Sequence, residues 1–208
     1  ACHEEGKIQP DRTIENLYLQ PLQQVIALKM TDTIATQVLI DIKSEPVATL
    51  NKLVELLQKY PSLIQNKKLS FVISGNQPEV SKYTNYPNYI QFDYQSLDNK
   101  LSPEQWNKVA LISLDFAKYS SWNGKGRLTE GDYEKVKSII DQAHRLGKPF
   151  RFWGCPDAKT AWKTFADLGV DFINTDLPYE SSRYLNTLNK RVYYNIIESK
   201  VYQPTFAS

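Results

Sequence analysis

The chain has 208 residues, with 25 Lys and Arg residues against 23 Asp and Glu residues and a formal net charge of +2. At about 150 residues per domain this length favours one large domain, and 41% apolar with 23% charged residues is typical of a globular protein, not of a disordered chain or a fibre. The basic residues are scattered and disfavour nucleic acid as a partner, and no apolar run approaches the roughly 20 residues of a membrane span. Cys2 and Cys155 are too few for a disulfide scaffold and lack the paired spacing of a zinc site.

Short β-rich runs alternate with longer amphipathic stretches along the chain. Six segments have the length and composition of strands: Val38–Ile42, Leu69–Ser74, Tyr89–Phe92, Val109–Leu114, Pro149–Trp153 and Val170–Thr175. Parallel strands need a crossover connection, usually a helix, so this alternation predicts a mostly parallel sheet covered by helices. An open doubly wound sheet and a (β/α)8 barrel are the two leading architectures. The segment from Tyr83 to Leu101 is the least regular and is expected to hold one strand within long loops.

Three of the intervening stretches carry helix start or stop signals. Pro46 suits the first turn of the helix after the first strand. Thr129 is expected to be the N-cap of the helix before the fifth strand, and Gly147 fits the position after its end. Asp157 is expected to cap the helix that follows the fifth strand, and Gly169 to end it.

The predicted strands carry polar residues near their C-terminal ends. Because alternate residues of a strand share a face, Asp41 lies on the same side as Lys43, and Arg151 on the same side as Trp153. Ligand sites of parallel α/β sheets lie outside the carboxyl ends of the strands, so these side chains are expected to surround one pocket. Its expected lining is Asp41, Lys43, Asp93, Asp115, Arg151, Trp153 and Asp176. Carboxylates suit a divalent metal and cations suit phosphate, whereas the alternative for any single strand is a solvated end.

Some of these residues keep two interpretations at this stage. Asp41 and Lys43 have the spacing of a catalytic pair and equally of a structural ion pair. His3 is either part of a disordered terminus or a general acid or base, whereas His144 lies off the apolar face of its helix and is expected to be solvated. The loop 122–126 is expected to be a turn, with a mobile active-site loop as the alternative. No glycine-rich phosphate loop of the two common kinds is present, so nucleotide binding of those kinds is not indicated.

Six stretches, taken in order, are similar to a known superfamily. They read ACHEE, LIDIKSEP, FVISGN, ISLDFAKYSSWNGKG, KPFRFWGCPD and GVDFINTDLP. In this order the chain resembles the glycerophosphodiester phosphodiesterase and phosphatidylinositol-specific phospholipase C superfamily, especially bacterial members with an Arg-Phe-Trp-x-x-Pro-Asp segment. The resemblance implies a (β/α)8 barrel with a divalent cation, Ca²⁺ or Mg²⁺, at its mouth and two histidines for acid–base chemistry.

The resemblance also implies roles for single residues of this chain. Asp41 matches the acidic metal ligand, Lys43 a neighbouring lysine that contacts phosphate during catalysis, and His3 the second catalytic histidine. Substrate-binding roles fall to Lys43, Trp153 and Asp176 by motif and to Arg151 and Asn174 by strand parity. One histidine would help water or an internal hydroxyl attack phosphorus while the other protonates the leaving alcohol.

The chain departs from the family pattern at its start. The His-Arg motif of the family's first strand and the Glu-x-Asp metal pair of its second are absent, so the six predicted strands correspond to the third to the eighth. Six βα units cannot close an eight-stranded barrel. We therefore expect residues 1–208 to be one N-terminally incomplete barrel domain, inactive by itself, with about 50 residues preceding it.

The first functional hypothesis is a metal-dependent phosphoric diester hydrolase, or a phospholipase-like lyase, acting on a small glycerophosphodiester-type substrate. The second is a catalytically silent barrel that binds a phosphorylated or polyol ligand through Lys43, Arg151 and Trp153. The third is an isomerase or aldolase with Lys43 as nucleophile, ranked last because Asp41 would favour the charged lysine. Secretion or a periplasmic location is implied by the resemblance alone.

Overall fold

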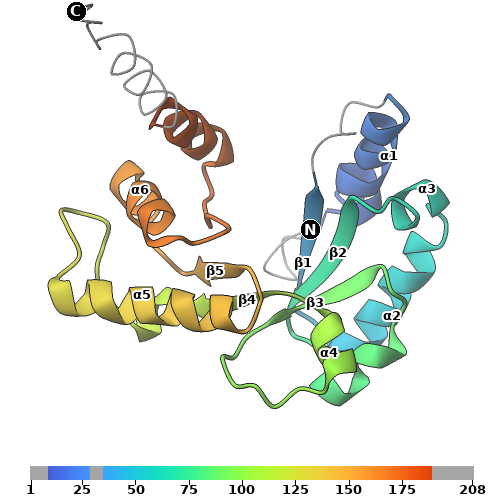
Figure 1. The fold of residues 1–208 in the computed structure, drawn as a ribbon. Coiled ribbons are helices and arrows are strands. Elements are labelled where there is room, and N and C mark those ends of the chain that lie inside the picture. The colour runs from blue at the N-terminus through green and yellow to red at the C-terminus, as the bar shows by residue number, and fades with distance from the viewer. Residues whose placement is uncertain (1–8, 29–34, 189–208) are drawn as a thin grey trace, which may run out of the picture. The chain divides into compact units, whose positions relative to one another are not determined.

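The computed structural model describes residues 9–28 and 35–188, and the chain divides into two compact units, residues 1–111 and 112–208. Helices alternate with strands along the chain (Figure 1), and the strand order is β1-β2-β3-β4-β5. The pairings β1–β2, β2–β3 and β4–β5 are parallel. The predicted α/β class is therefore confirmed. Within the described ranges the structure has five strands, and the closed eight-stranded barrel stays a prediction.

The sheet of the first unit follows the expected alternation of faces. Its strands are β1 (Thr36–Ile42), β2 (Leu69–Gly75), β3 (Ile90–Tyr94) and the first residues of β4 (Val109–Asp115). Val38, Ile40 and Ile42 are more buried than Leu39 and Asp41, which face the other side. In the pairing of β1 with β2, Asp41 lies opposite Ser74. The face assigned to Asp41 from the sequence is therefore confirmed.

The helices of the first unit begin where local sequence chemistry allows. They are η2 (Glu15–Leu19), α1 (Gln20–Ala27), α2 (Pro46–Leu57), α3 (Pro61–Ile64), η3 (Val80–Asn85) and α4 (Pro103–Asn107). Pro46 opens α2 as predicted, and the Glu45 carboxylate before it accepts hydrogen bonds from the backbone N–H groups of Val47 (3.0 Å) and Ala48 (2.6 Å). These two bonds hold the pKa of Glu45 below its usual value. α2 then buries three leucines against the sheet.

The second unit repeats the strand–helix pattern after β4. Its further elements are η4 (Phe116–Lys118), α5 (Glu130–Arg145), β5 (Phe150–Trp153) and α6 (Lys159–Leu168). Thr129 caps α5 as predicted, accepting a hydrogen bond from the Asp132 N–H at 3.2 Å. Gly147 and Gly169 follow α5 and α6 with φ of +72° and +92°, which confirms both stop signals. In the loop 122–126 the Trp122 indole donates to the Lys125 carbonyl at 3.0 Å.

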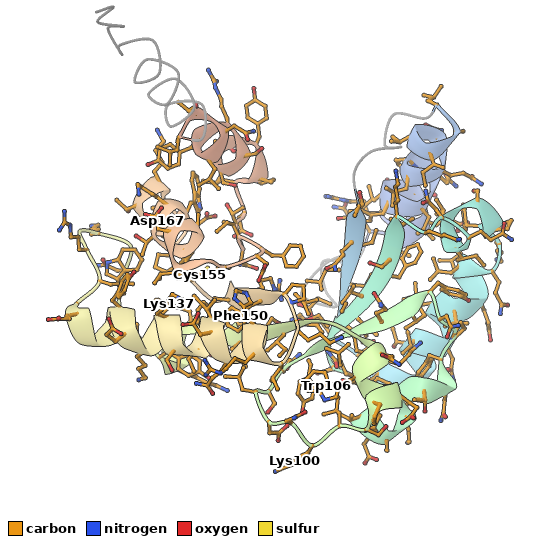
Figure 2. All side chains as sticks on the ribbon, in the orientation of Figure 1. Lys100, Trp106, Lys137, Phe150, Cys155 and Asp167 are labelled. Carbon is orange, nitrogen blue, oxygen red and sulfur yellow. The ribbon has the colours of Figure 1, made fainter. Side chains whose placement is uncertain are left out.

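An aromatic core fixes the orientation of β5. Phe152 lies edge-on to Phe150 and Phe116, with ring centroids 4.6 and 5.5 Å apart, and Phe116 meets Phe165 of α6 at 5.2 Å. These rings are almost fully buried, and edge-to-face packing of this kind stabilises beyond the burial of apolar area. Figure 2 labels Phe150 among the side chains of the structure. Because Phe150 and Phe152 face the helices, the residues between and after them, Arg151 and Trp153, face the opposite side.

The sixth expected strand, Val170–Thr175, is absent from the described residues. Only an isolated bridge between Phe172 and Arg151 forms there. The Asp171 carboxylate accepts from the Phe150 N–H at 2.7 Å, and beyond the bridge the Asp176 N–H donates to the Asp157 carboxylate at 2.7 Å. The Asp171 side chain therefore takes up a backbone N–H of β5 that a sixth strand would have paired in a ladder.

Asp157 differs from the expectation, and His144 has a contact that the sequence did not predict. Asp157 does not cap α6, whose N-cap position is held by Ala158 with no side-chain hydrogen bond. His144 contacts the Asp171 carboxylate through Nε2 at 2.8 Å, although its side chain remains 40% exposed as expected. No helix within residues 9–28 and 35–188 combines the length and apolar character needed to cross a bilayer.

Candidate active site

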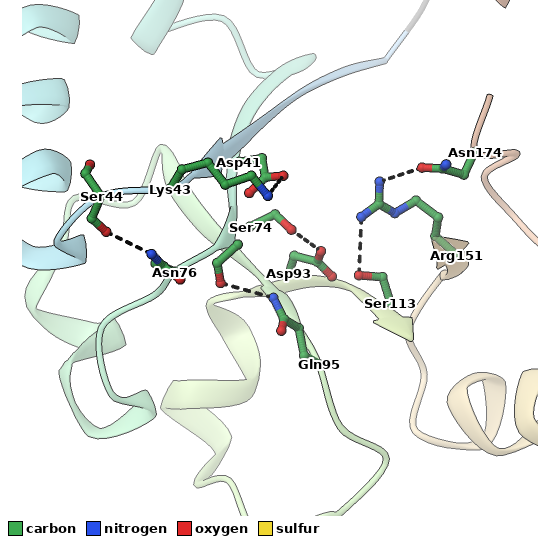
Figure 3. Close-up of polar contacts among 11 residues, drawn as sticks. Asp41, Lys43, Ser44, Ser74, Asn76, Asp93, Gln95, Ser113, Arg151 and Asn174 are labelled. Carbon is green, nitrogen blue, oxygen red and sulfur yellow. Dashed lines mark hydrogen bonds and ion pairs between the residues drawn. The ribbon is translucent and has the colours of Figure 1, made fainter. Parts of the chain in front are cut away.

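In the first unit, the predicted pair at the end of β1 forms an ion pair. Lys43 Nζ lies 2.7 Å from Asp41 Oδ2, with 51% of the lysine side chain and 42% of the aspartate side chain exposed (Figure 3). An ion pair this open to solvent contributes at most about 1 kcal/mol to stability. Its exposure leaves both groups reachable by a ligand, so the contact is compatible with a structural pair and with a catalytic one.

Gly75 supports the Asp41 carboxylate, and sequence reasoning did not identify it. Its φ is +70°, and a Cβ there would lie 2.0 Å from Asp41 Oδ1 and 2.5 Å from the Ile42 carbonyl oxygen. Only glycine accommodates both the backbone conformation and this approach. The available signal was a glycine directly after a predicted strand, at the edge where the polar residues lie.

A buried hydrogen-bond network lies at the ends of β2 and β3. The Ser74 hydroxyl donates to Asp93 Oδ2 at 2.7 Å, and Asp93 is fully buried (Figure 3). Gln77 Nε2 donates to the Asp93 carbonyl at 2.7 Å, and the Tyr83 hydroxyl donates to Gln77 Oε1. Burial, with the nearby Asp93 charge, raises the pKa of Tyr83. Asp93 therefore helps to hold this edge of the sheet and is not exposed on a pocket wall.

In the second unit, the Arg151 guanidinium is held on the face predicted from strand parity. Nη1 donates to Asn174 Oδ1 at 3.2 Å, and Nη2 lies at 3.5 Å from the Ser113 hydroxyl, a long and weak contact (Figure 3). Ser113 lies opposite Arg151 in the β4–β5 pairing. Trp153, two residues further along the same face, is 41% exposed. A fixed guanidinium beside an exposed indole can bind a phosphate group and an adjoining organic group.

The remaining predicted residues have different surroundings. Asp115 caps η4 by accepting from the Ala117 N–H at 3.1 Å. Asp176 is exposed, and its backbone N–H, not its carboxylate, is held by Asp157. No hydrogen bond or ion pair joins the Asp176 carboxylate to another residue of the described ranges, so its substrate role stays a prediction. His3 lies outside the described residues.

The described residues do not form a metal site by themselves. No group of three or more His, Cys, Asp or Glu side chains in residues 9–28 and 35–188 could hold an ion. Asp41 is engaged by Lys43, and the other nearby carboxylate, Asp93, is buried against Ser74. Ca²⁺ and Mg²⁺ take several oxygen ligands, so Asp41 alone does not satisfy either ion. The dependence on a divalent metal therefore stays a prediction.

The described residues define an α/β protein with parallel strands that carry polar residues at their carboxyl ends. Residues 149–179, which contain Arg151 and Asn174, match the model of the glycerophosphoryl diester phosphodiesterase family. The fold is similar to the crystal structure of a glycerophosphodiester phosphodiesterase from Parabacteroides distasonis ATCC 8503, with a TM-score of 0.51 and 16% sequence identity. That similarity covers 81% of this chain and 64% of the other, so this chain spans less than two thirds of the related protein. No match was found among curated proteins.

The predicted resemblance to the glycerophosphodiester phosphodiesterase superfamily is confirmed by the family model over residues 149–179, and the structural neighbour shows a similar fold. The match to the family model is confined to 31 residues around β5 and α6. The prediction that Asp41, Lys43, Arg151, Trp153 and Asp176 line one cavity is not tested by the contacts within each unit.

Proposed function

We propose that this chain belongs to a phosphoric diester hydrolase that acts on glycerophosphodiester-type substrates. The observation that carries the proposal is the coincidence of two independent features. The residues that match the family model, 149–179, are also those that hold the Arg151 guanidinium against Asn174 at the end of β5. The exposed indole of Trp153 on the same face supports a substrate with an organic group next to its phosphate.

The charged residues suit the reaction at phosphorus. Attack on a phosphodiester by water or an internal hydroxyl places negative charge on the phosphoryl oxygens, and the leaving alcohol takes up a proton. In the proposal, Arg151 binds these oxygens through its paired N–H groups, and Asn174 keeps the guanidinium in place. From the resemblance, Lys43 is proposed as a phosphate-contacting cation, His3 as the proton-transferring histidine, and Asp41 as a contributor to a divalent-metal site.

A substrate screen tests the function as a whole. The complete protein is incubated with glycerophosphodiesters, and release of alcohol is measured with Ca²⁺, with Mg²⁺ and with a chelator. We expect hydrolysis that the chelator abolishes. Binding of these compounds without turnover would overturn the enzymatic proposal and favour the silent ligand-binding barrel. Full activity in the presence of chelator would show that the reaction does not depend on a divalent metal.

Lys43 offers a test of one residue. The change Lys43→Met keeps most of the side-chain length and removes the charge, and since Lys43 is half exposed, the fold should be unaffected. We expect kcat/KM to fall about a hundredfold or more, as when one group that stabilises a developing oxyanion is removed. The matched control is Lys100→Met, a more exposed lysine whose Asp98 partner lies at 3.6 Å. If Lys43→Met is as active as this control, Lys43 does not act in the reaction.

A further inference from the structure

Asp157 accepts three hydrogen bonds although it lies at the surface. Oδ1 accepts from the Trp162 indole at 2.7 Å and from the Thr175 hydroxyl at 2.6 Å, and Oδ2 accepts from the Asp176 N–H at 2.7 Å. Desolvation acts to raise the pKa of Asp157, but the three hydrogen bonds outweigh it and hold the pKa below its usual value. The carboxylate is therefore charged at neutral pH and joins the start of α6 to the segment 174–177.

The same segment is held from a second side by the loop before Asp157. The Cys155 thiol lies 3.7 Å from the Asn174 carbonyl oxygen, at the range of a weak S–H hydrogen bond, and burial raises its pKa to about 11. Cys155 therefore stays a neutral thiol, whose one proton can go to the Asn174 carbonyl oxygen or to the Phe152 carbonyl oxygen at 3.8 Å. Thr175 Oγ1, held by Asp157, accepts in turn from the Leu177 N–H at 2.9 Å. The backbone at Asn174 and directly after it is thus held by contacts with Cys155 and Asp157.

This anchoring matters because Asn174 has no strand to hold it. The backbone bridge ends at Phe172, two residues earlier. A strand ladder would hold the backbone at Asn174, but here hydrogen bonds with residues 155–157 hold the backbone at and after it. Asn174 Oδ1 in turn accepts from Arg151 Nη1. A continuous chain of contacts therefore runs from the Asp157 carboxylate to the guanidinium.

We propose that Asp157 is a positioning residue that fixes Asn174, and through it the Arg151 guanidinium, in the orientation that binds a phosphate group. The inference rests on the proposed function, because it takes Arg151 as a phosphate-binding residue. Asp157 itself touches no substrate. Its replacement should weaken anion binding by Arg151 without altering the reacting groups.

The test compares inorganic phosphate affinity in two backgrounds by calorimetric titration of the complete protein. In Asp157→Asn, an amide NH2 group replaces one of the two carboxylate oxygens. Both oxygens accept hydrogen bonds, so in either orientation of the amide the NH2 group meets a hydrogen-bond donor and at least one bond is lost. We expect phosphate affinity to fall about tenfold. In an Arg151→Lys background the same change should lower phosphate affinity less than about twofold, because a lysine ammonium does not depend on a hydrogen bond to Asn174 for its orientation as the guanidinium does. The Arg151 Nε–Hε NMR signal should also shift in Asp157→Asn.

Thr175 and Trp162 provide matched controls. Thr175→Val removes the hydroxyl and should reproduce part of the loss of affinity, whereas Thr175→Ser keeps the hydroxyl and should restore affinity to the unmodified level. Trp162→Phe removes the indole donor and leaves the bonds from Thr175 and Asp176, so stability should fall while phosphate affinity stays the same. If Asp157→Asn does not fold, the Thr175 pair carries the test with the same predictions.

The outcomes separate this inference from the function beneath it. If Arg151→Lys leaves phosphate affinity unchanged, Arg151 is not the phosphate-binding residue and the proposed function loses its support. If Arg151→Lys weakens binding but Asp157→Asn or Thr175→Val does not, the positioning role is wrong while the function stands. Equal losses from Asp157→Asn in both backgrounds would also contradict it, because they would indicate a general structural effect.

Discussion

The polar residues at the end of β1 and those after β5 are held in place by different means. Asp41 lies within a regular strand, opposite Ser74 of β2, so its direction is set by the backbone ladder. Asn174 lies beyond the last backbone bridge and is positioned by hydrogen bonds from residues 155–157. Strand periodicity alone therefore locates the first group, whereas the second depends on particular side chains far apart in the sequence.

The largest expected effect on stability concerns the end of β1, where the backbone ladder holds Asp41 close to Gly75. Gly75→Ala would place a Cβ 2.5 Å from the Ile42 carbonyl oxygen at a φ of +70°. We expect the free energy of unfolding to fall by about 3 kcal/mol or more, measured by urea titration. Gly126→Ala is the matched control, because its φ is +67° and a Cβ there meets nothing within 4 Å. It should cost about 1 kcal/mol, and equal losses in both variants would show that close approach at Gly75 is unimportant.

A smaller effect on stability is expected for Asp157, which holds the segment after β5, and this effect depends on pH. The pKa of Asp157 is lowered from 3.8 in the folded protein, so its hydrogen bonds stabilise the fold above that pH and lose their effect as pH falls through the folded pKa. In Asp157→Asn the group no longer titrates. Between pH 7 and pH 3, the free energy of unfolding should therefore decline less in this variant than in the unmodified protein. An identical decline in both would mean that Asp157 is not stabilised as a carboxylate.

The smallest effect on stability is expected for Asp41→Asn. Since the ion pair with Lys43 is about half exposed, removing its charge should change the free energy of unfolding by less than about 1 kcal/mol. If Asp41 is a metal ligand, metal affinity and activity of the complete protein should fall together, as measured by titration with Ca²⁺ and Mg²⁺. Unchanged metal dependence in this variant would remove Asp41 from the metal site.

Periodicity and capping rules predicted much of the fold. Pro46, Thr129, Gly147 and Gly169 mark helix ends as expected, because these signals act through neighbouring backbone groups. The strand at 170–175 was predicted wrongly, since its apolar pattern does not reveal that Asp171 and Asp157 take up backbone N–H groups nearby.

The candidate site was predicted only in part. Parity correctly assigned the faces of Asp41 and Arg151 within their own units. Gly75 and Asp157 were missed as supports, because both act through a neighbour that is distant in the sequence. The role of Asp157 was misjudged as a helix cap because its position before α6 fits a capping residue, whereas its partners are the side chain of Trp162 in the first turn of α6 and groups of Thr175 and Asp176.

The most direct test of the account is the kcat/KM of the complete protein and of its Arg151→Lys variant on a glycerophosphodiester. Lysine keeps the positive charge but cannot present the paired N–H groups of arginine. The account predicts turnover by the unmodified protein and a loss of about a hundredfold in the variant, with the midpoint of urea unfolding unchanged. Equal turnover by the two proteins would contradict the assignment of the β5 edge to phosphodiester chemistry.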